Sequence, residues 1–201
     1  MPGSPGAQPL LLASASPRRR ELLALLGVPF EAVATEVEEL TEGDPAELVV
    51  ANALRKARAG RELVAAGDGV SDGSGRIVIG VDTDVAIAGE VLGKPTDATG
   101  AAARLRRLSG RAHEVLSGVA VIAPGGEEEA GLERTVVRFR DLAEHEIEAY
   151  VASREWEDRA GGYAVQGLGS SLVSRIDGDL SNVIGLPISL LTAMIARLHD
   201  D

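Results

Sequence analysis

Three consecutive arginines begin at Arg18 and follow a serine–proline pair in the segment "SASPRRRELLALL". Serine before proline is typical of a helix N-cap followed by the first helical residue, and the leucines after the arginines recur at helical spacing. A helix N-terminus is partially positive, so arginines there weaken the helix by roughly a few tenths of a kcal/mol. A bound polyphosphate would reverse that effect by contacting guanidinium and backbone N–H groups together. We therefore expect Ser14, Ser16, Arg18 and Arg19 to bind phosphate; the alternative is a solvated basic face.

Carboxylates that could complete such a site occur at Asp82 in "GVDTD" and at Glu36, Glu38 and Glu39 within "TEVEEL". We expect Asp82 just beyond the carboxyl end of a strand, where open α/β sheets bind their ligands. Carboxylate oxygens suit Mg²⁺ or Mn²⁺, which bridge to substrate phosphates and activate water. An aspartate in a turn and a glutamate run in a solvated loop are the alternatives. The arginine segment is no Walker loop, because "GxxxxGK[ST]" is absent.

The chain has only two lysines, Lys56 in "LRKARAG" and Lys94 in "LGKP". A compact ammonium suits charge neutralisation in a tight phosphate site, although a lysine in mid-helix is often on the surface. Gln166 lies in the glycine-rich segment "GGYAVQGLGSSLV" and offers both a donor and an acceptor. We expect Gln166 to contact the edge of a nucleobase; capping of a hairpin is the alternative.

The elements that must position these residues show in the pattern of the chain, where apolar runs alternate with helical patterns, so we predict an α/β fold with a mixed sheet and flanking helices. The expected strands are 10–13, 29–35, a strand ending at Asp82, a hairpin at 85–93, long strands at 113–123 and 131–140, and strands near 162–166 and 170–176. The expected helices are 17–26, 45–66, about 96–109, 143–153 and 186–198.

Composition excludes several classes of protein. The chain carries 20 basic and 31 acidic residues, a net charge of −11, and only 2% aromatic residues, which disfavours a polynucleotide partner. No apolar run reaches the roughly 20 residues of a membrane span. Cysteine is absent and the three histidines are scattered, which disfavours disulfides and zinc sites and favours the cytoplasm. Residues 1–9 lack the features of a secretory signal and are expected to form a disordered tail.

Taken together, the segments resemble the Maf family of nucleotide pyrophosphatases. The matching segments follow one another over about residues 10 to 190 and include "LLASASPRRRELL", "GVDT", "GEVLGKP", "LRRLSGRAHEV", "DRAGGYAVQGLGSSLV" and "IDGDLSNVIGLP". The resemblance implies a nucleoside triphosphate substrate, which is hydrolysed to the monophosphate and pyrophosphate with a divalent metal. It also implies an elongated, two-lobed fold similar to inosine triphosphatases, one catalytic domain over 10–201, and a homodimer.

The resemblance also assigns roles to individual residues. Asp82 would be the proton acceptor, Glu38 would hold the metal together with Asp82, and Lys56 and Lys94 would join the arginines in binding phosphates. The expected catalytic residues are therefore Asp82, Glu38, Lys56 and Lys94.

Base preference follows from three further positions. Family members that prefer dTTP and UTP carry arginine, threonine and glutamine where this chain has Arg18, Thr83 and Gln166. Relatives that act on 7-methyl-GTP typically carry tryptophan, glutamine and glutamate there. We therefore expect dTTP and UTP as substrates; a different base preference or a non-catalytic, nucleotide-binding regulator of cell division are the alternatives.

The chain departs from the family pattern at a few positions. Asp84 adds a carboxylate where an apolar residue is usual, Arg159 replaces a common lysine, and Ala164 replaces a common glycine. The glycine-rich loop at 67–75 is longer than is typical of the family. Asp84 could alter metal binding, and Ala164 could narrow the base pocket.

Overall fold

The structure is a computed structural model that describes residues 10–66 and 75–200 of the 201-residue chain. The expected tail at 1–9 lies outside the described residues, as does the loop at 67–75 except for Gly75.

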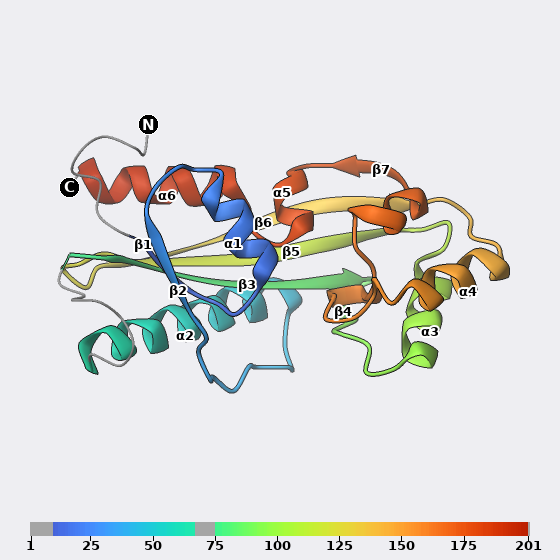
Figure 1. The fold of residues 1–201 in the computed structure, drawn as a ribbon, viewed down its shortest axis with the longest axis horizontal. Helices are drawn as coiled ribbons and strands as arrows, with labels where there is room; N and C mark the ends of the chain where they lie inside the picture. The colour runs from blue at the N-terminus through green and yellow to red at the C-terminus, as the bar shows by residue number, and fades with distance from the viewer. Residues whose placement is uncertain (1–9, 67–74, 201) are drawn as a thin grey trace.

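A single seven-stranded mixed sheet runs along the long axis of the molecule (Figure 1). Its strand order is β2-β1-β3-β5-β6-β7, with the short β4 paired to β3. Strand β1 is parallel to both β2 and β3, and every other pairing is antiparallel. The strands are β1 (Leu10–Ala13), β2 (Phe30–Val33), β3 (Ile77–Ile87), β4 (Glu90–Val91), β5 (Ala112–Ile122), β6 (Glu128–Phe139) and β7 (Val173–Asp177).

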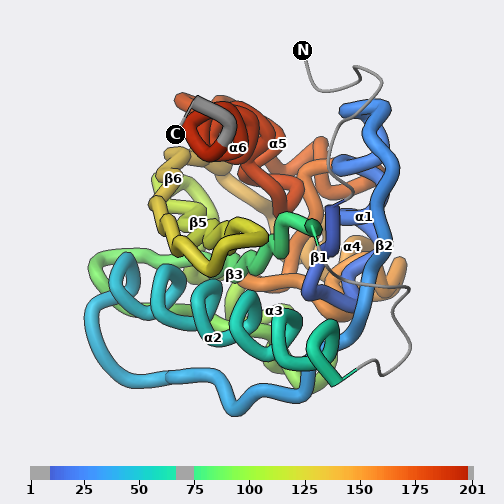
Figure 2. The backbone as a smooth tube through the Cα atoms, turned by 90° about the vertical axis from the view of Figure 1, so that its left-hand side faces the viewer, coloured from blue at the N-terminus to red at the C-terminus, as the bar shows by residue number. Residues whose placement is uncertain are grey.

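Helices cover both faces of this sheet, with α2 on one face and α6 on the other (Figure 2). Among the described residues, no helix is both long enough and apolar enough to span a bilayer. The α-helices are α1 (Pro17–Ala24), α2 (Pro45–Ala66), α3 (Ala98–Leu108), α4 (Glu144–Ser153), α5 (Leu180–Ile184) and α6 (Ile188–Asp200), and two 3-10 helices are η1 (Ala160–Gly162) and η2 (Gly167–Leu172). The predicted α/β fold with flanking helices is confirmed.

Helix α2 packs unusually close to the sheet. A Cβ atom at Gly80 of β3 would lie 2.1 Å from the Ala53 carbonyl oxygen, and one at Gly118 of β5 would lie 2.1 Å from the Val49 carbonyl oxygen. Only glycine allows the helix backbone to approach the strands this closely. The side chains of α2 that face the sheet therefore lie directly against the middle of β3.

The two ends of β3 belong to different hydrophobic cores. Ile77, Ile79 and Val81 pack with β1, α1 and α6. Val85 and Ile87 pack instead with α3, α4 and the aromatic rings of Phe139 and Tyr163. Pairing of β1 with β3 stops at Gly80, although β5 continues to pair with β3 as far as Ala86. Between Gly80 and Ala86, where β4 begins to pair, the edge of β3 on the β1 side is therefore open, at the point where one core ends and the other begins.

Two local predictions were wrong, and one element was not predicted. Asp82 does not follow a strand end but lies in mid-strand, because pairing with β5 as far as Ala86 and with β4 at Ala86 and Ile87 keeps β3 extended. The strand expected near 162–166 is absent from the described chain, where η1 and an irregular segment occur instead. The short helix α5 was not predicted, since five residues give too little periodicity to recognise.

Candidate active site

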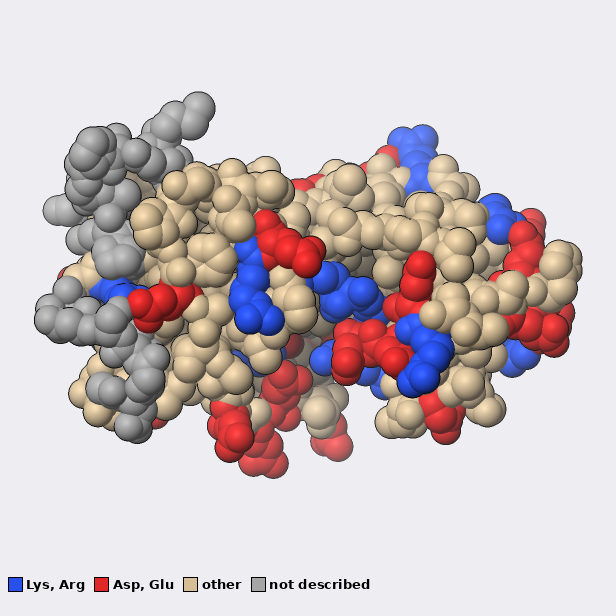
Figure 3. All heavy atoms as spheres, viewed as in Figure 1, with Lys and Arg blue, Asp and Glu red and all other residues tan. Residues whose placement is uncertain are grey.

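A cleft of about 440 Å³ opens beside the exposed edge of β3. Figure 3 shows basic side chains gathered in a hollow midway along the molecule, with acidic side chains to either side. One wall is the turn from β1 into α1, and the other is formed by residues 158–166 together with the loop after β4. The cleft therefore lies between segments that are far apart in the sequence.

The β1–α1 turn places polar groups on the first wall. Ser16 is the N-cap of α1 and Pro17 its first residue, as predicted, but the Ser16 side chain makes no capping hydrogen bond. The Ser16 N–H instead donates to Ser14 Oγ at 3.3 Å, and both serines line the cleft. The Ser16 hydroxyl and the N-terminus of α1 are thus available to a ligand in the cleft.

The three arginines have different environments. Arg19 donates to three oxygens: Gly185 O at 2.9 Å, Thr83 Oγ1 at 3.1 Å and Ser14 Oγ at 3.2 Å. Burial lowers the pKa of Arg19 from its usual value, and the Asp82 carboxylate opposes that shift. These bonds to oxygens on three elements fix its guanidinium in one orientation.

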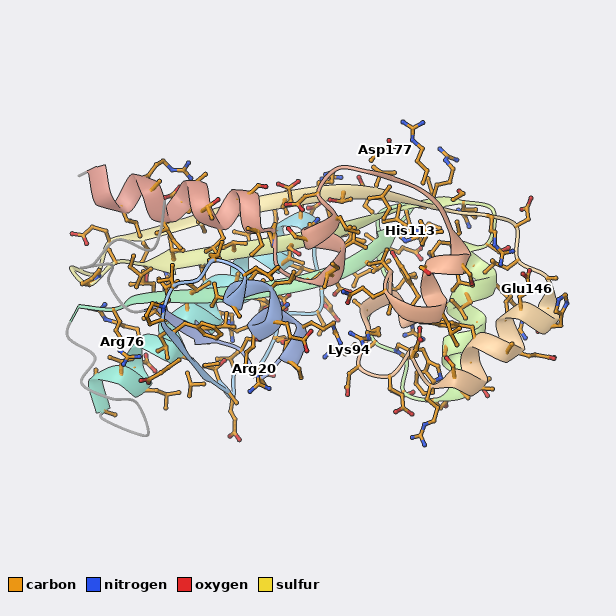
Figure 4. All side chains as sticks on the ribbon, turned by 45° about the horizontal axis from the view of Figure 1, so that its top comes forward. Arg20, Arg76, Lys94, His113, Glu146 and Asp177 are labelled. Atoms are coloured by element: carbon orange, nitrogen blue, oxygen red, sulfur yellow. The ribbon has the colours of Figure 1, made fainter. Side chains whose placement is uncertain are left out.

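Arg18 reaches across the cleft, where its Nη2 donates to the Asp158 carbonyl oxygen at 3.2 Å. Burial lowers the pKa of Arg18, and the Asp158 carboxylate partly offsets this. Arg20 is exposed, lies outside the cleft lining and projects away from α1 (Figure 4). Two of the three arginines therefore serve the cleft.

Lys56 links two carboxylates at the inner end of the cleft. Its Nζ lies 2.6 Å from Asp82 Oδ1 and 2.6 Å from Glu39 Oε1. Asp82 is only 8% exposed, and its second oxygen accepts a hydrogen bond from Asn52 Nδ2 at 3.3 Å. Asn52 and Lys56 are four residues apart, so α2 presents both to the same carboxylate. The ammonium thus lies between the buried aspartate and the half-exposed glutamate.

Asp84 follows on the same strand, and its surroundings differ from those of Asp82. Burial raises the pKa of Asp84 to about 6, with smaller upward contributions from Asp82 and Glu39 and a downward contribution from the N–H groups of Val85 and Gly93. Asp84 does not line the cleft, and no ion pair of its carboxylate is found among the described residues.

The second wall carries further polar groups. Lys94, on the loop after β4, lines the cleft on the side opposite α1 (Figure 4). Arg159 also lines it, and its buried Nη1 has no hydrogen-bond partner in the part of the chain that the structure describes. Tyr163 lies deeper, with its hydroxyl 2.8 Å from Nε2 of the buried His113. This wall adds cations and an aromatic ring to the cleft.

Comparison with known proteins assigns this chain to a family. The model of the family described as "Maf-like protein" matches residues 9–198. The chain belongs to the Maf family.

Maf relatives with curated names match nearly the whole chain. The dTTP/UTP pyrophosphatase of Deinococcus radiodurans is 46% identical over 187 residues, which cover 92% of this chain and 91% of the relative. The dTTP/UTP pyrophosphatase of Symbiobacterium thermophilum is 46% identical over 192 residues, or 94% of each chain.

Solved structures overlap with part of the chain. A nucleoside-triphosphatase (dITP/XTP pyrophosphatase) of Mycobacterium abscessus is 25% identical with a TM-score of 0.44, and covers 67% of this chain and 75% of its own. The Staphylococcus aureus Ham1 protein is 12% identical with a TM-score of 0.46, and covers 67% and 73%.

The structure gathers most of the residues that the sequence singled out. Glu38 is exposed and lies outside the lining of the cleft, where the neighbouring Glu39 is found instead. Asp82 does not line the cleft itself but contacts Lys56, which does. The remaining predicted residues line this Maf cleft: Ser14, Ser16, Arg18, Arg19, Lys56, Thr83, Lys94 and Gln166.

Sequence reasoning missed several residues of the site. Asn52 carries a usable signal, since it lies one helical turn before Lys56 on a predicted helix. Glu39 was one of the three candidate glutamates of its loop, but Glu38 was preferred, because nothing in an irregular loop distinguishes the two. Asp158 and the Gly185 carbonyl contact the arginines only through the tertiary fold.

Proposed function

We propose that this Maf protein hydrolyses dTTP and UTP to the nucleoside monophosphate and pyrophosphate. One observation carries the proposal: Lys56 bridges Asp82 and Glu39 at 2.6 Å each, beside the two arginines of the α1 N-terminus. Cations for a triphosphate thus line one cleft, and a buried carboxylate for proton transfer contacts the lysine of that cleft. The names of the curated relatives support the same reaction and the same nucleotides.

The reaction is hydrolysis at the α-phosphorus. Water forms a new bond to the α-phosphorus, the bond from that phosphorus to the α–β bridging oxygen breaks, and pyrophosphate departs with those electrons. The water proton passes to Asp82, whose Oδ1 and Oδ2 each already accept one hydrogen bond. A carboxylate has about four acceptor positions, so lone pairs stay free for the water.

The basic groups stabilise the charge that builds up on the phosphates. Arg18, Arg19 and the N-terminus of α1 face the cleft from one wall and Lys94 from the other. Arg19 is held by three oxygens before substrate arrives, so little reorganisation is needed in the transition state. Lys56 orients the Asp82 carboxylate through its 2.6 Å contact with Oδ1.

The carboxylates near Lys56 also fit a divalent cation. Among the described residues no group of three or more His, Cys, Asp or Glu side chains could hold a metal alone. Mg²⁺ and Mn²⁺ do not need one, because they bind through one or two carboxylates, water and substrate phosphates. Asp82 and Glu39, which already share one cation, would hold the metal; Glu39 replaces Glu38 in this role. Such a metal would lower the pKa of a water molecule bound to it and would neutralise phosphate charge.

Preference for pyrimidines rests on Arg18, Thr83 and Gln166. Thr83 acts indirectly, since its hydroxyl accepts from Arg19 at 3.1 Å and contacts Ser117 Oγ at 2.8 Å. Gln166 is exposed at the mouth of the cleft, where its amide is available to a base.

The test is a panel of nucleoside triphosphates assayed for pyrophosphate release, with and without a chelator. We expect release from dTTP and UTP that chelation abolishes. Strong preference for 7-methyl-GTP would overturn the base assignment. Nucleotide binding without any release would instead support a non-catalytic regulator.

A further inference from the structure

Residues 164–166 line the cleft and include Gln166. Two side chains bind the main chain of the segment 164–169. The Ala164 N–H donates to Tyr150 Oη at 2.9 Å. The N–H groups of Leu168 and Gly169 donate to Glu155 Oε1 at 2.9 Å and Oε2 at 3.1 Å. These contacts lie before and after Gln166 in the chain, so the main chain is held on both sides of it.

The segment is folded tightly around the Glu155 carboxylate. A Cβ atom at Gly167 would lie 2.5 Å from Glu155 Oε1, and one at Gly169 would lie 1.9 Å from the Ala164 carbonyl oxygen. A larger residue at either glycine would therefore force the segment apart. The main chain fits this carboxylate because the glycines let it approach.

The holding groups are themselves fixed. Tyr150 is 3% exposed and belongs to the core between α3 and α4, and burial raises its pKa to about 12, so its hydroxyl stays protonated. Glu155 lies two residues after the end of α4, and both of its carboxylate oxygens accept main-chain N–H groups. Hydrogen bonds to an ionised acceptor are roughly twice as strong as those between neutral groups. The core of the second half of the molecule thus fixes the wall of the cleft.

We infer that Glu155 and Tyr150 are positioning residues that set base selectivity by holding Gln166 and its main chain against the cleft. The inference rests on the proposed function. A held wall offers the Gln166 amide to a pyrimidine edge at a constant distance, and it also limits the room for a larger purine. If the wall were looser, Gln166 would bind a pyrimidine less well and a purine would find more room. Selectivity depends on groups that are held to within a fraction of an ångström.

The test compares Glu155→Gln with Glu157→Gln as the matched control. Glu157 lies two residues away and pairs with the exposed Arg154, not with the 164–169 segment. In Glu155→Gln one amide N–H must face a main-chain N–H, so one of the two bonds is lost. We expect the ratio of kcat/KM for UTP over GTP to fall about tenfold, mainly through a higher KM for UTP. The control should keep the wild-type ratio.

Two additional measurements separate positioning from general damage. Inorganic tripolyphosphate lacks a base, so its inhibition constant should not change in Glu155→Gln. Hydrogen exchange at the Leu168 and Gly169 amides should become faster. In the double variant with Gln166→Ala, the ratio should fall no further than in Gln166→Ala alone, since both changes act through one side chain.

Tyr150→Phe removes a single hydroxyl and carries the same test if Glu155→Gln does not fold. An unchanged ratio of kcat/KM for UTP over GTP in folded Glu155→Gln and Tyr150→Phe would overturn the inference. An equal fall in kcat/KM for UTP and GTP, together with equally weakened inhibition by tripolyphosphate, would also overturn it. If the wild-type protein releases pyrophosphate from no nucleotide, the proposed function fails. The ratio of UTP and GTP dissociation constants in the same variants then decides the inference on its own.

Discussion

Replacing Asp82 with asparagine, alongside the same change at Asp84, separates the proposed base from a neighbouring carboxylate. The two residues occupy alternate positions of β3 and therefore face the same side of the sheet. Asp82 accepts hydrogen bonds from Lys56 at 2.6 Å and from Asn52 at 3.3 Å. Asp84 accepts the Val85 N–H at 3.0 Å. Neither carboxylate lines the cleft, but only Asp82 contacts Lys56, which does.

The size of the effect follows from these contacts. A positioned general base contributes about 10²- to 10⁴-fold, so kcat should fall by about 10³ in Asp82→Asn, or roughly 4 kcal/mol of barrier. Asn52 cannot reorient, because its amide makes two hydrogen bonds to the Leu40 main chain at 2.8 and 3.0 Å. The new amide must therefore direct its N–H₂ at either Asn52 or Lys56, which lowers the free energy of unfolding by about 1–2 kcal/mol.

The assay is pyrophosphate release from UTP, with thermal unfolding to establish that each variant is folded. In Asp82→Asn the KM for UTP should stay within about threefold of wild type, because Arg18, Arg19 and Lys94 are unchanged. Asp84→Asn should keep kcat within about threefold of wild type. Retention of more than about a tenth of kcat by Asp82→Asn would refute the role of Asp82 as base, since a general base is worth at least 10²-fold. Equal losses of kcat in both variants would show that disturbance of strand β3, and not removal of one carboxylate, lowers the activity.

Other parts of the structure lead to three further predictions. Arg159→Met should raise the KM for UTP about tenfold, through loss of a cleft cation, whereas Arg154→Met should not; equal KM values would exclude Arg159 from binding. Burial lowers the pKa of His113 from 6.5 to about 4. Between these two pH values, the unfolded chain therefore binds a proton at His113 that the folded chain does not. The free energy of unfolding should therefore fall by up to about 3 kcal/mol from about pH 6.5 to 4, and urea unfolding of His113→Gln should show a shallower slope with pH. Gly118→Ala should destabilise the protein by about 3 kcal/mol, because its Cβ would meet Val49 O, and a loss below about 1 kcal/mol in urea unfolding would contradict this packing.

Some properties could be predicted from the sequence because their causes are local. The strand at Leu10–Ala13 and the start of α1 at Pro17 follow from an apolar run, a serine N-cap and a proline. Helix α2 begins at Pro45, and Asp44 Oδ1 accepts the Ala46 N–H at 2.9 Å, as an acidic N-cap before proline indicates. The cytoplasmic location and the homodimer stay predictions.

Only the tertiary structure decided which charged groups meet. Asp82 looked like the end of a strand, but β5 extends β3 past it while β1 does not, and this unequal pairing opens the cleft. Glu38 and Glu39 are equivalent in the sequence, and the position of Lys56 on α2 selects Glu39. Periodicity and capping act over a few residues, whereas the contacts of a loop carboxylate depend on segments that only the folded sheet brings together. The sequence by itself therefore determined most of the helices and strands and the basic β1–α1 turn. The fold determined which loop carboxylate lies in the cleft beside that turn.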